Sequence, residues 1–137
     1  MNRIAVIFVL IAGALNASSS QASYCLIPDL DSSFDRAELV FIAVLTSAST
    51  EDLYTALGHF RVEDSLKGEP PPEISLDAHI GPTLSCGLEL IIGKPYLVFL
   101  NKGQASISPG TGSRIVDGKN NIIDWIVYRQ QKKSTAK

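Results

Sequence analysis

The stretch that decides the fold of this chain is Ser85-Cys86-Gly87, followed by Gly93-Lys94-Pro95-Tyr96-Leu97-Val98-Phe99-Leu100. It holds one of only two cysteines, and its second part is rich in residues that favour β-strands. The other cysteine, Cys25, lies just beyond an apolar N-terminus. Two cysteines in an exported chain predict one disulfide bond, with two free buried thiols as the alternative. Closing the loop of 61 residues between Cys25 and Cys86 contributes about 4 kcal/mol to the free energy of unfolding in the chain-entropy model.

The N-terminus has the pattern of a signal peptide over residues 1–22. Arg3 supplies a positive charge, Ile4–Leu15 is an apolar run, and Ser20-Gln21-Ala22 places small residues where signal peptidase reads them. A membrane anchor is the alternative, but the run is shorter than the roughly 20 residues that a span needs. We therefore expect one domain, residues 23–137, that is secreted or periplasmic and has no membrane span after cleavage.

Composition and motifs argue against several kinds of chemistry. The formal net charge is −2, and no basic stripe or aromatic platform indicates a nucleic-acid partner. The chain lacks a nucleophile elbow, an H-E-x-x-H motif and a Walker loop, so we expect neither an enzyme nor a cofactor. His59 and His79, with no third ligand nearby, make a weak metal site, and we expect them on a solvated surface. Asp29, Asp31 and Asp35 lack the register of a calcium loop.

Hydrophobic periodicity predicts four to six short strands, which is typical of a small antiparallel barrel or a sandwich. The expected strands are Leu39–Thr46, Tyr54–Asp64, Glu73–Ile80 and Tyr96–Leu100, with short ones at Ala105–Ser108 and Arg114–Val116. Leu39–Thr46 is apolar on both faces, which indicates a central strand. The next two strands alternate, so each is half-buried, and Gly58 is expected to mark a bulge or a bend. The expected core aromatics are Phe41, Phe60 and Phe99.

Helix is expected only at the edges of the domain. Ser32–Glu38 predicts one or two helical turns with a serine as N-cap. Asn121–Gln131 carries isoleucine and valine at helical spacing and predicts a C-terminal helix, with a strand as the alternative because Ile, Trp, Val and Tyr also favour sheets. Gly110-Thr111-Gly112-Ser113 is expected to be a flexible connection.

Five sequence features occur in a characteristic order and spacing over residues 25–101. They are Cys25-Leu26-Ile27-Pro28, Arg36–Leu45, Tyr54–Lys67 with its Lys67-Gly68 exit, Ser85-Cys86-Gly87 and Gly93–Phe99. Together they resemble the netrin-like (NTR) domain of the tissue inhibitors of metalloproteinases (TIMP), in a minimal, bacterial-type version. The resemblance implies a five-stranded barrel of the oligonucleotide/oligosaccharide-binding (OB) type, with Cys25 bonded to Cys86. The expected fold class is therefore all-β: a small five-stranded OB-like barrel with a short helix before its first strand and a C-terminal helix.

The resemblance also implies a function. In this family the α-amine and carbonyl of an N-terminal cysteine chelate the catalytic zinc of a metalloproteinase, which is chemistry that an open zinc position allows. It implies an exported, non-enzymatic domain that binds a protein partner, in the manner of a metalloproteinase inhibitor, through Ser23, Tyr24 and Cys25. This chain departs from the pattern, since Ser23 and Tyr24 precede the cysteine and Ile27 replaces a second one. The disulfide as a simple staple of the N-terminal segment is the other interpretation.

The alternative function is an envelope or periplasmic OB-fold module. Such a module would bind a carbohydrate or another ligand on the face of its sheet. Periodicity alone does not choose between a barrel and a sandwich as the architecture.

Overall fold

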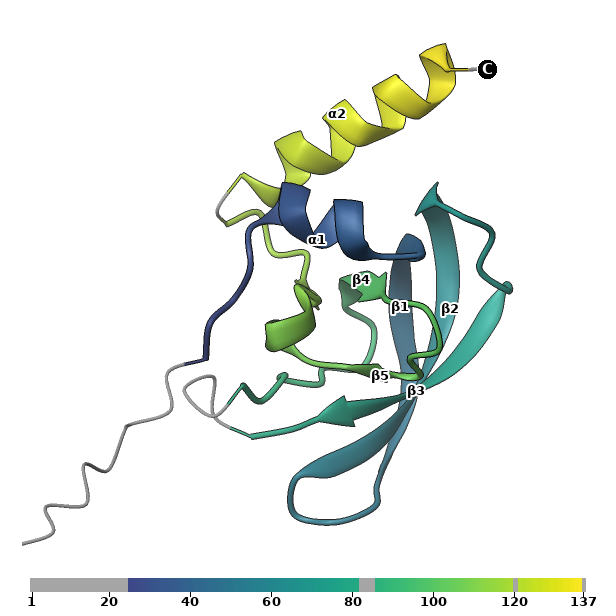
Figure 1. Cartoon of the computed structure of the whole chain (residues 1–137). Coiled ribbons are helices and arrows are strands. Elements are labelled where there is room, and N and C mark those ends of the chain that lie inside the picture. The colour runs from purple at the N-terminus through teal and green to yellow at the C-terminus, as the bar shows by residue number, and fades with distance from the viewer. Residues whose placement is uncertain (1–24, 82–85, 120, 137) are drawn as a thin grey trace, which may run out of the picture.

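The computed structural model describes residues 25–81, 86–119 and 121–136 (Figure 1). The expected signal peptide lies outside the described residues, as do Ser23, Tyr24 and Ser85. Within the described part, no helix is both long enough and apolar enough to cross a membrane. The chain is mostly β-strand, with one short helix before the first strand and a longer helix at the C-terminus, as the sequence predicts.

Among the described residues, six strands form a single curled sheet in the order β5-β3-β2-β1-β4-β6 (Figure 1). The strands are β1 (Leu39–Thr50), β2 (Thr55–Lys67), β3 (Glu73–His79), β4 (Pro95–Leu100), β5 (Ser106–Ile107) and β6 (Arg114–Ile115). All six overlap strands expected from the sequence. The number five is wrong, because the chain after β4 forms two two-residue strands at opposite edges of the sheet.

The order of the strands is that of a Greek key. β1, β2 and β3 pair antiparallel in sequence order, and β4 returns to lie antiparallel beside β1. This spatial order, 4-1-2-3, defines the motif. β5 then crosses to the far edge and pairs with β3 in parallel, while β6 pairs with β4.

Strand β4 and the first seven residues of β1, Leu39–Leu45, are covered on both faces. In β4, Tyr96 and Val98 face the concave core of the sheet, whereas Leu97 and Phe99 face a second core under the helices. A strand covered on both sides needs no polar face, which is why its sequence is a continuous apolar run. All three predicted core aromatics are buried, namely Phe41 and Phe60 in the first core and Phe99 in the second.

Irregular pairing between β1 and β2 curls the sheet. The register shifts three times along this pair, and one shift leaves Thr46 without a partner opposite the step from His59 to Phe60. Such bulges bend the strands and increase their twist. This bulge lies in β1 and not at Gly58. Gly58 instead makes room for an aromatic ring, since a Cβ there would lie 2.7 Å from Cε2 of Phe60.

Helix α1 (Leu30–Arg36) overlaps the helix predicted over Ser32–Glu38 but begins two residues earlier, and its N-cap is not a serine. The cap is Asp29, whose carboxylate accepts hydrogen bonds from the Ser32 backbone N–H at 2.8 Å and from the Ser32 hydroxyl at 2.7 Å. Both Asp and Ser cap helices well, so residue type alone does not identify the cap. These bonds lower the pKa of the Asp29 carboxyl, the backbone bond most of all.

Helix α2 (Ile122–Thr135) confirms the predicted C-terminal helix, and the strand alternative is wrong. Ile122 and Ile126 are one helical turn apart, and both are buried in the second core. Phe34 of α1 and Trp125 of α2 pack edge to face at 5.9 Å between ring centroids. The two helices therefore lie together over the outer face of the sheet (Figure 1).

The expected flexible connection at Gly110–Ser113 is a packed turn. Pro109–Thr111 forms a single 3₁₀ turn, η2, and the buried Ser113 hydroxyl accepts a hydrogen bond from the Phe99 backbone N–H at 3.0 Å. Gly112 has φ of 95°, and a Cβ at this position would lie 2.4 Å from Oγ of Ser33 in α1. The turn and the first helix are therefore in direct contact, and only glycine fits between them.

Gly112→Ala is expected to lower the free energy of unfolding by about 2–5 kcal/mol, because it combines a left-handed backbone with overpacking. Gly103→Ala is the matched control, since Gly103 also has a positive φ of 76° but a Cβ there meets nothing within 4 Å. The control should lose only about 1–2 kcal/mol. Urea unfolding followed by fluorescence measures both losses. Equal losses would show that the contact with α1 is unimportant.

Candidate functional site

The two cysteines form a disulfide bond, as the sequence predicts, with 4.9 Å between the Cα atoms of Cys25 and Cys86. Free thiols, the alternative, are therefore excluded. The bond joins residues that are 61 positions apart in the sequence. It attaches the extended N-terminal segment to the chain that follows β3.

Close backbone packing fixes the position of Cys86. A Cβ on Gly87 would lie 2.2 Å from the carbonyl oxygen of Gly81, so the two segments touch along their main chains. The Leu88 N–H donates a hydrogen bond to the His79 carbonyl at 2.6 Å, just beyond β3. Cys86 itself has φ of 60°, a conformation that persists only where the surroundings impose it. The disulfide is therefore mounted on a rigid support.

Arg114 holds the other end of the N-terminal segment. Its guanidinium donates to the Pro28 carbonyl at 3.0 Å and to the Gly112 carbonyl at 2.9 Å. Partial burial lowers the pKa of Arg114 from its usual high value, although an arginine stays protonated in proteins. The chain from Cys25 to Asp29 is thus held by a disulfide, by a charged hydrogen bond and by the cap of α1.

Two apolar side chains project from this anchored segment. Leu26 is 85 % exposed and Ile27 is 47 % exposed. Beside Ile27 lies a cleft of about 230 Å³, whose lining includes Leu88, Arg114, Ile115 and Ile122. Exposed apolar side chains on a fixed backbone, next to a partly apolar cleft, are typical of a docking surface.

The surface continues across Leu88 toward the hairpin between β1 and β2. A second cleft, of about 320 Å³, is lined by Ala48, Ser49, Thr50, Ala56, Ile80, Leu88 and Leu90. Leu88 lines both clefts, so they are neighbours. The loop of the hairpin exposes two more large side chains, Leu53 and Tyr54. We refer to Leu26, Ile27 and the two clefts as the N-terminal surface.

The segment between the disulfide and β4 is also held firmly. The buried Tyr96 hydroxyl donates to the Glu89 carbonyl at 2.6 Å and accepts from the Ile91 N–H at 2.8 Å. Burial raises the pKa of Tyr96 above its usual value, so this hydroxyl keeps its proton. One side of the N-terminal surface is thereby fastened to a central strand.

The two histidines lie apart along the same pair of strands. His59 is opposite Ser75 and His79 is opposite Thr55, a separation of four residues or about 13 Å along the strand. His59 is exposed, as expected, and its Nδ1 lies 2.6 Å from the Ser75 hydroxyl, whereas His79 is half-buried. The structure therefore does not bring them together as ligands of one ion. The described residues contain no group of three His, Cys, Asp or Glu side chains placed to hold a metal.

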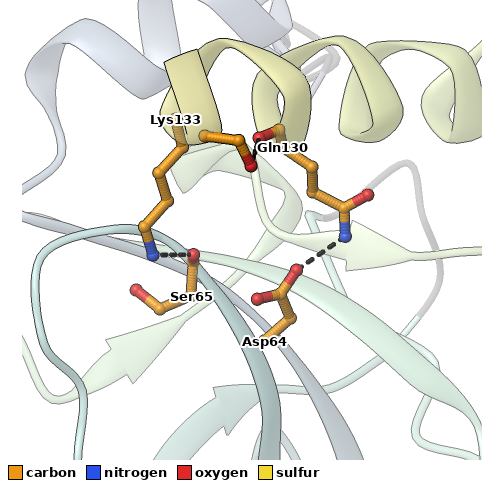
Figure 2. Close-up of a pocket in the computed structure, with 5 residues that line it drawn as sticks. Asp64, Ser65, Gln130 and Lys133 are labelled. Carbon is orange, nitrogen blue, oxygen red and sulfur yellow. Dashed lines mark hydrogen bonds between the residues drawn. The ribbon is translucent and has the colours of Figure 1, made fainter. Parts of the chain in front are cut away.

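Two of the aspartates near the N-terminus, Asp29 and Asp31, accept hydrogen bonds within the fold. Asp31 accepts hydrogen bonds from Nε1 of Trp125 at 2.9 Å and from the Arg129 guanidinium at 2.6 Å, and these bonds lower the pKa of its carboxyl. Asp29 is occupied at the cap of α1. Further along α2, Gln130 donates to Asp64 at 2.6 Å and Lys133 donates to the Ser65 carbonyl at 2.5 Å, which docks the helix on β2 (Figure 2).

The structure thus brings together Cys25 and Cys86 of the predicted site, while Ser23 and Tyr24 lie outside the described residues. Arg114 was predicted only as part of a strand, because no sequence signal connects it with Pro28. The signal for Leu26-Ile27 in the sequence is an apolar pair within a segment that a proline keeps out of strand and helix. The chain matches no model of a known protein family, and no curated protein matches it.

Replacing both cysteines, Cys25→Ser with Cys86→Ser, is expected to lower the melting temperature by about 15–30 °C. The loop closure contributes about 4 kcal/mol, and each kcal/mol moves a small domain by about 4–8 °C. Calorimetry of the double variant and of the reduced wild-type chain should agree. An unchanged melting temperature would mean that the disulfide contributes nothing to stability.

Proposed function

We propose that this chain is an exported netrin-like domain that acts by binding a protein partner and not by catalysis. The Greek-key order of the strands, with β5 returning to β3, supports a partly open barrel of the OB type. The disulfide supports export to an oxidising compartment, either outside the cell or in the periplasm. In this proposal the signal peptide is residues 1–22 and the domain is residues 23–137.

The observation that carries the proposal is the exposed pair Leu26-Ile27 on a backbone held at both ends. Association usually costs conformational entropy, because loops and side chains become ordered at the interface. The disulfide at Cys25 and the bond from Arg114 to Pro28 reduce the backbone part of that cost in advance. Apolar anchors at the centre of an interface, with polar surroundings, are what protein partners recognise.

A zinc metalloproteinase is the partner that the netrin-like resemblance favours. A mature chain that begins at Cys25 has a free α-amine next to the disulfide, and an amine with its carbonyl can occupy the open position of a catalytic zinc. A chain that begins at Ser23 has no such amine at the cysteine. It would bind through Leu26, Ile27 and the adjoining clefts, without coordinating the metal.

The test is Ile27→Ser compared with Val127→Ser, which alters an equally exposed residue on α2. Ile27 is 47 % and Val127 is 43 % exposed. The exported wild-type chain is expected to inhibit members of a panel of zinc metalloproteinases. Ile27→Ser should weaken inhibition about tenfold, because one well-buried aliphatic side chain contributes about 1.5–3 kcal/mol. Val127→Ser should inhibit as the wild type does.

Inhibition constants from a fluorogenic peptide assay give the comparison, and the intact mass of the exported chain gives its first residue. If the exported chain starts at Ser23 and still inhibits, chelation by Cys25 is excluded, and the N-terminal surface remains the proposed binding site. Absence of inhibition across the panel would reject a metalloproteinase as the partner. Equal weakening by both variants would reject the N-terminal surface.

The second candidate is a module that binds an oligosaccharide on the sheet. A cleft of about 410 Å³ lies over β2 and β3 and is lined by Thr46, His59, Phe60, Glu73, Ile74 and Ser75. In OB-type barrels this face binds oligosaccharides and oligonucleotides. The polar groups of His59, Ser75 and Glu73 are suited to sugar hydroxyls.

A glycan array probed with the exported chain is expected to give specific signals if this second candidate is right. His59→Ala should abolish them, since it removes a polar group at the centre of the cleft, and Lys94→Ala should leave them unchanged. The same variants are compared by titration at up to about 1 mM glycan. An array without signals would count decisively against this candidate.

A further inference from the structure

A basic pocket lies at the opposite end of α1 from the disulfide. It has a volume of about 340 Å³ and opens between α1, the end of β2 and the last turns of α2. These three elements meet at one end of the molecule (Figure 1). Its lining is Phe34, Leu66, Arg129, Lys132, Lys133 and Ala136. We call it the α1–α2 pocket.

The apolar lining of the α1–α2 pocket is the ring of Phe34 and the buried Leu66. Two cations approach the same ring. The Arg129 guanidinium carbon lies 4.0 Å from the ring centroid, and Lys67 Nζ lies 5.1 Å from it. Such cation–π contacts hold positive charge beside an apolar surface.

Positive charge around the pocket is only partly neutralised. Arg129 is paired with Asp31 at 2.6 Å. Among the described residues, no carboxylate lies within 4 Å of the ammonium groups of Lys67, Lys132 or Lys133. Lys67 Nζ donates to the carbonyls of Phe34 and Asp35 at the end of α1, and Lys133 donates to that of Ser65.

The nearest acidic side chain on β2 belongs to the neighbouring cleft. Figure 2 shows Gln130 and Lys133 reaching from α2 to β2, where Gln130 binds the Asp64 carboxylate and Lys133 binds the Ser65 carbonyl. That cleft is lined by Asp64, Ser65, Gln130, Lys133 and Ser134. Lys133 lines both cavities. The Asp64 carboxylate lies in the neighbouring cleft, whereas the apolar side chains line the α1–α2 pocket.

Arg129, which also lines the α1–α2 pocket, carries a donor that is not satisfied. Nε of Arg129 is buried and has no hydrogen-bond partner among the described residues. Most buried polar groups are satisfied, and an exception often marks the place of a water or a bound ion.

We propose that the α1–α2 pocket binds a carboxylate attached to an apolar body. The apolar part lies against Phe34, Leu66 and Ala136, and the carboxylate meets the ammonium groups of Lys132 and Lys133. The volume is within the range of ligand-binding cavities. Both a fatty acid and the C-terminus of a peptide ending in a large apolar residue present this chemistry. The proposal is independent of the N-terminal surface.

The experiment titrates the exported chain, labelled for NMR, with decanoate and with a short peptide whose last residue is phenylalanine. Decanol and the same peptide as its C-terminal amide are the uncharged controls. The acids are expected to shift signals of residues around Phe34 and Arg129 and to bind at least tenfold more tightly than the controls. The better of the two acids identifies the source of the carboxylate.

Two variants test the pocket itself. Lys132→Ala with Lys133→Ala removes two charges from its rim and should weaken binding at least tenfold. The matched control, Lys102→Ala with Lys119→Ala, removes the same charge from surface loops and should bind as the wild type does. Ala136→Phe keeps every charge but fills the pocket, and it should also weaken binding.

Three results would overturn the proposal. One is the absence of binding by either acid at up to about 10 mM. Another is equal binding by an acid and its uncharged control. The third is unchanged binding by both the lysine double variant and Ala136→Phe. Melting temperatures of all variants verify that each one is folded.

Discussion

The disulfide between Cys25 and Cys86 is the constraint on which the N-terminal surface depends. Residues 25–29 belong to no strand or helix, so no ladder of hydrogen bonds holds them to the sheet. The covalent bond does so instead, and it works because Cys86 is fixed by the backbone contact between Gly81 and Gly87. The extended segment is therefore held in place by the chain just after β3. Without the bond, the contact from Arg114 to Pro28 would be the main tie before the cap of α1.

Helix α1 has only seven residues, too few to be stable alone, yet it connects both surfaces described above. Its stability comes from neighbours that are distant in the sequence. Gly112 touches Ser33, and Trp125 and Arg129 bind Asp31, so the turn after β5 and the helix α2 both hold it. Its N-terminal end receives the disulfide-bonded segment, and Phe34 near its C-terminal end lines the α1–α2 pocket.

The curled sheet itself acts as a scaffold. Its curvature comes from bulges between β1 and β2, and its rigidity comes from β4 and the first seven residues of β1, which are covered on both faces. The exposed apolar side chains of the N-terminal surface are carried on connections, namely the N-terminal segment and the hairpin loop between β1 and β2. This is the usual division between a fold and the sites placed on it, and the proposed function is therefore argued from the surface and not from the barrel alone.

The sequence by itself determined the strands, the C-terminal helix and the disulfide. Apolar runs on two faces identified β1 and β4, alternation identified β2 and β3, and a chain with only two cysteines allows only one cysteine pair. Periodicity reports how deeply each position is buried, but it does not identify the residues that bury it.

The tertiary structure alone decided that Arg114 binds the carbonyl of Pro28, that Asp31 binds Trp125 and Arg129, and that Asp29 caps α1 in place of a serine. It also decided that the two short strands predicted after β4 pair at opposite edges of the sheet, since such short strands form only where a neighbouring strand is already in place. These contacts join residues far apart in the chain, and their partners are chosen by the packing of the whole domain.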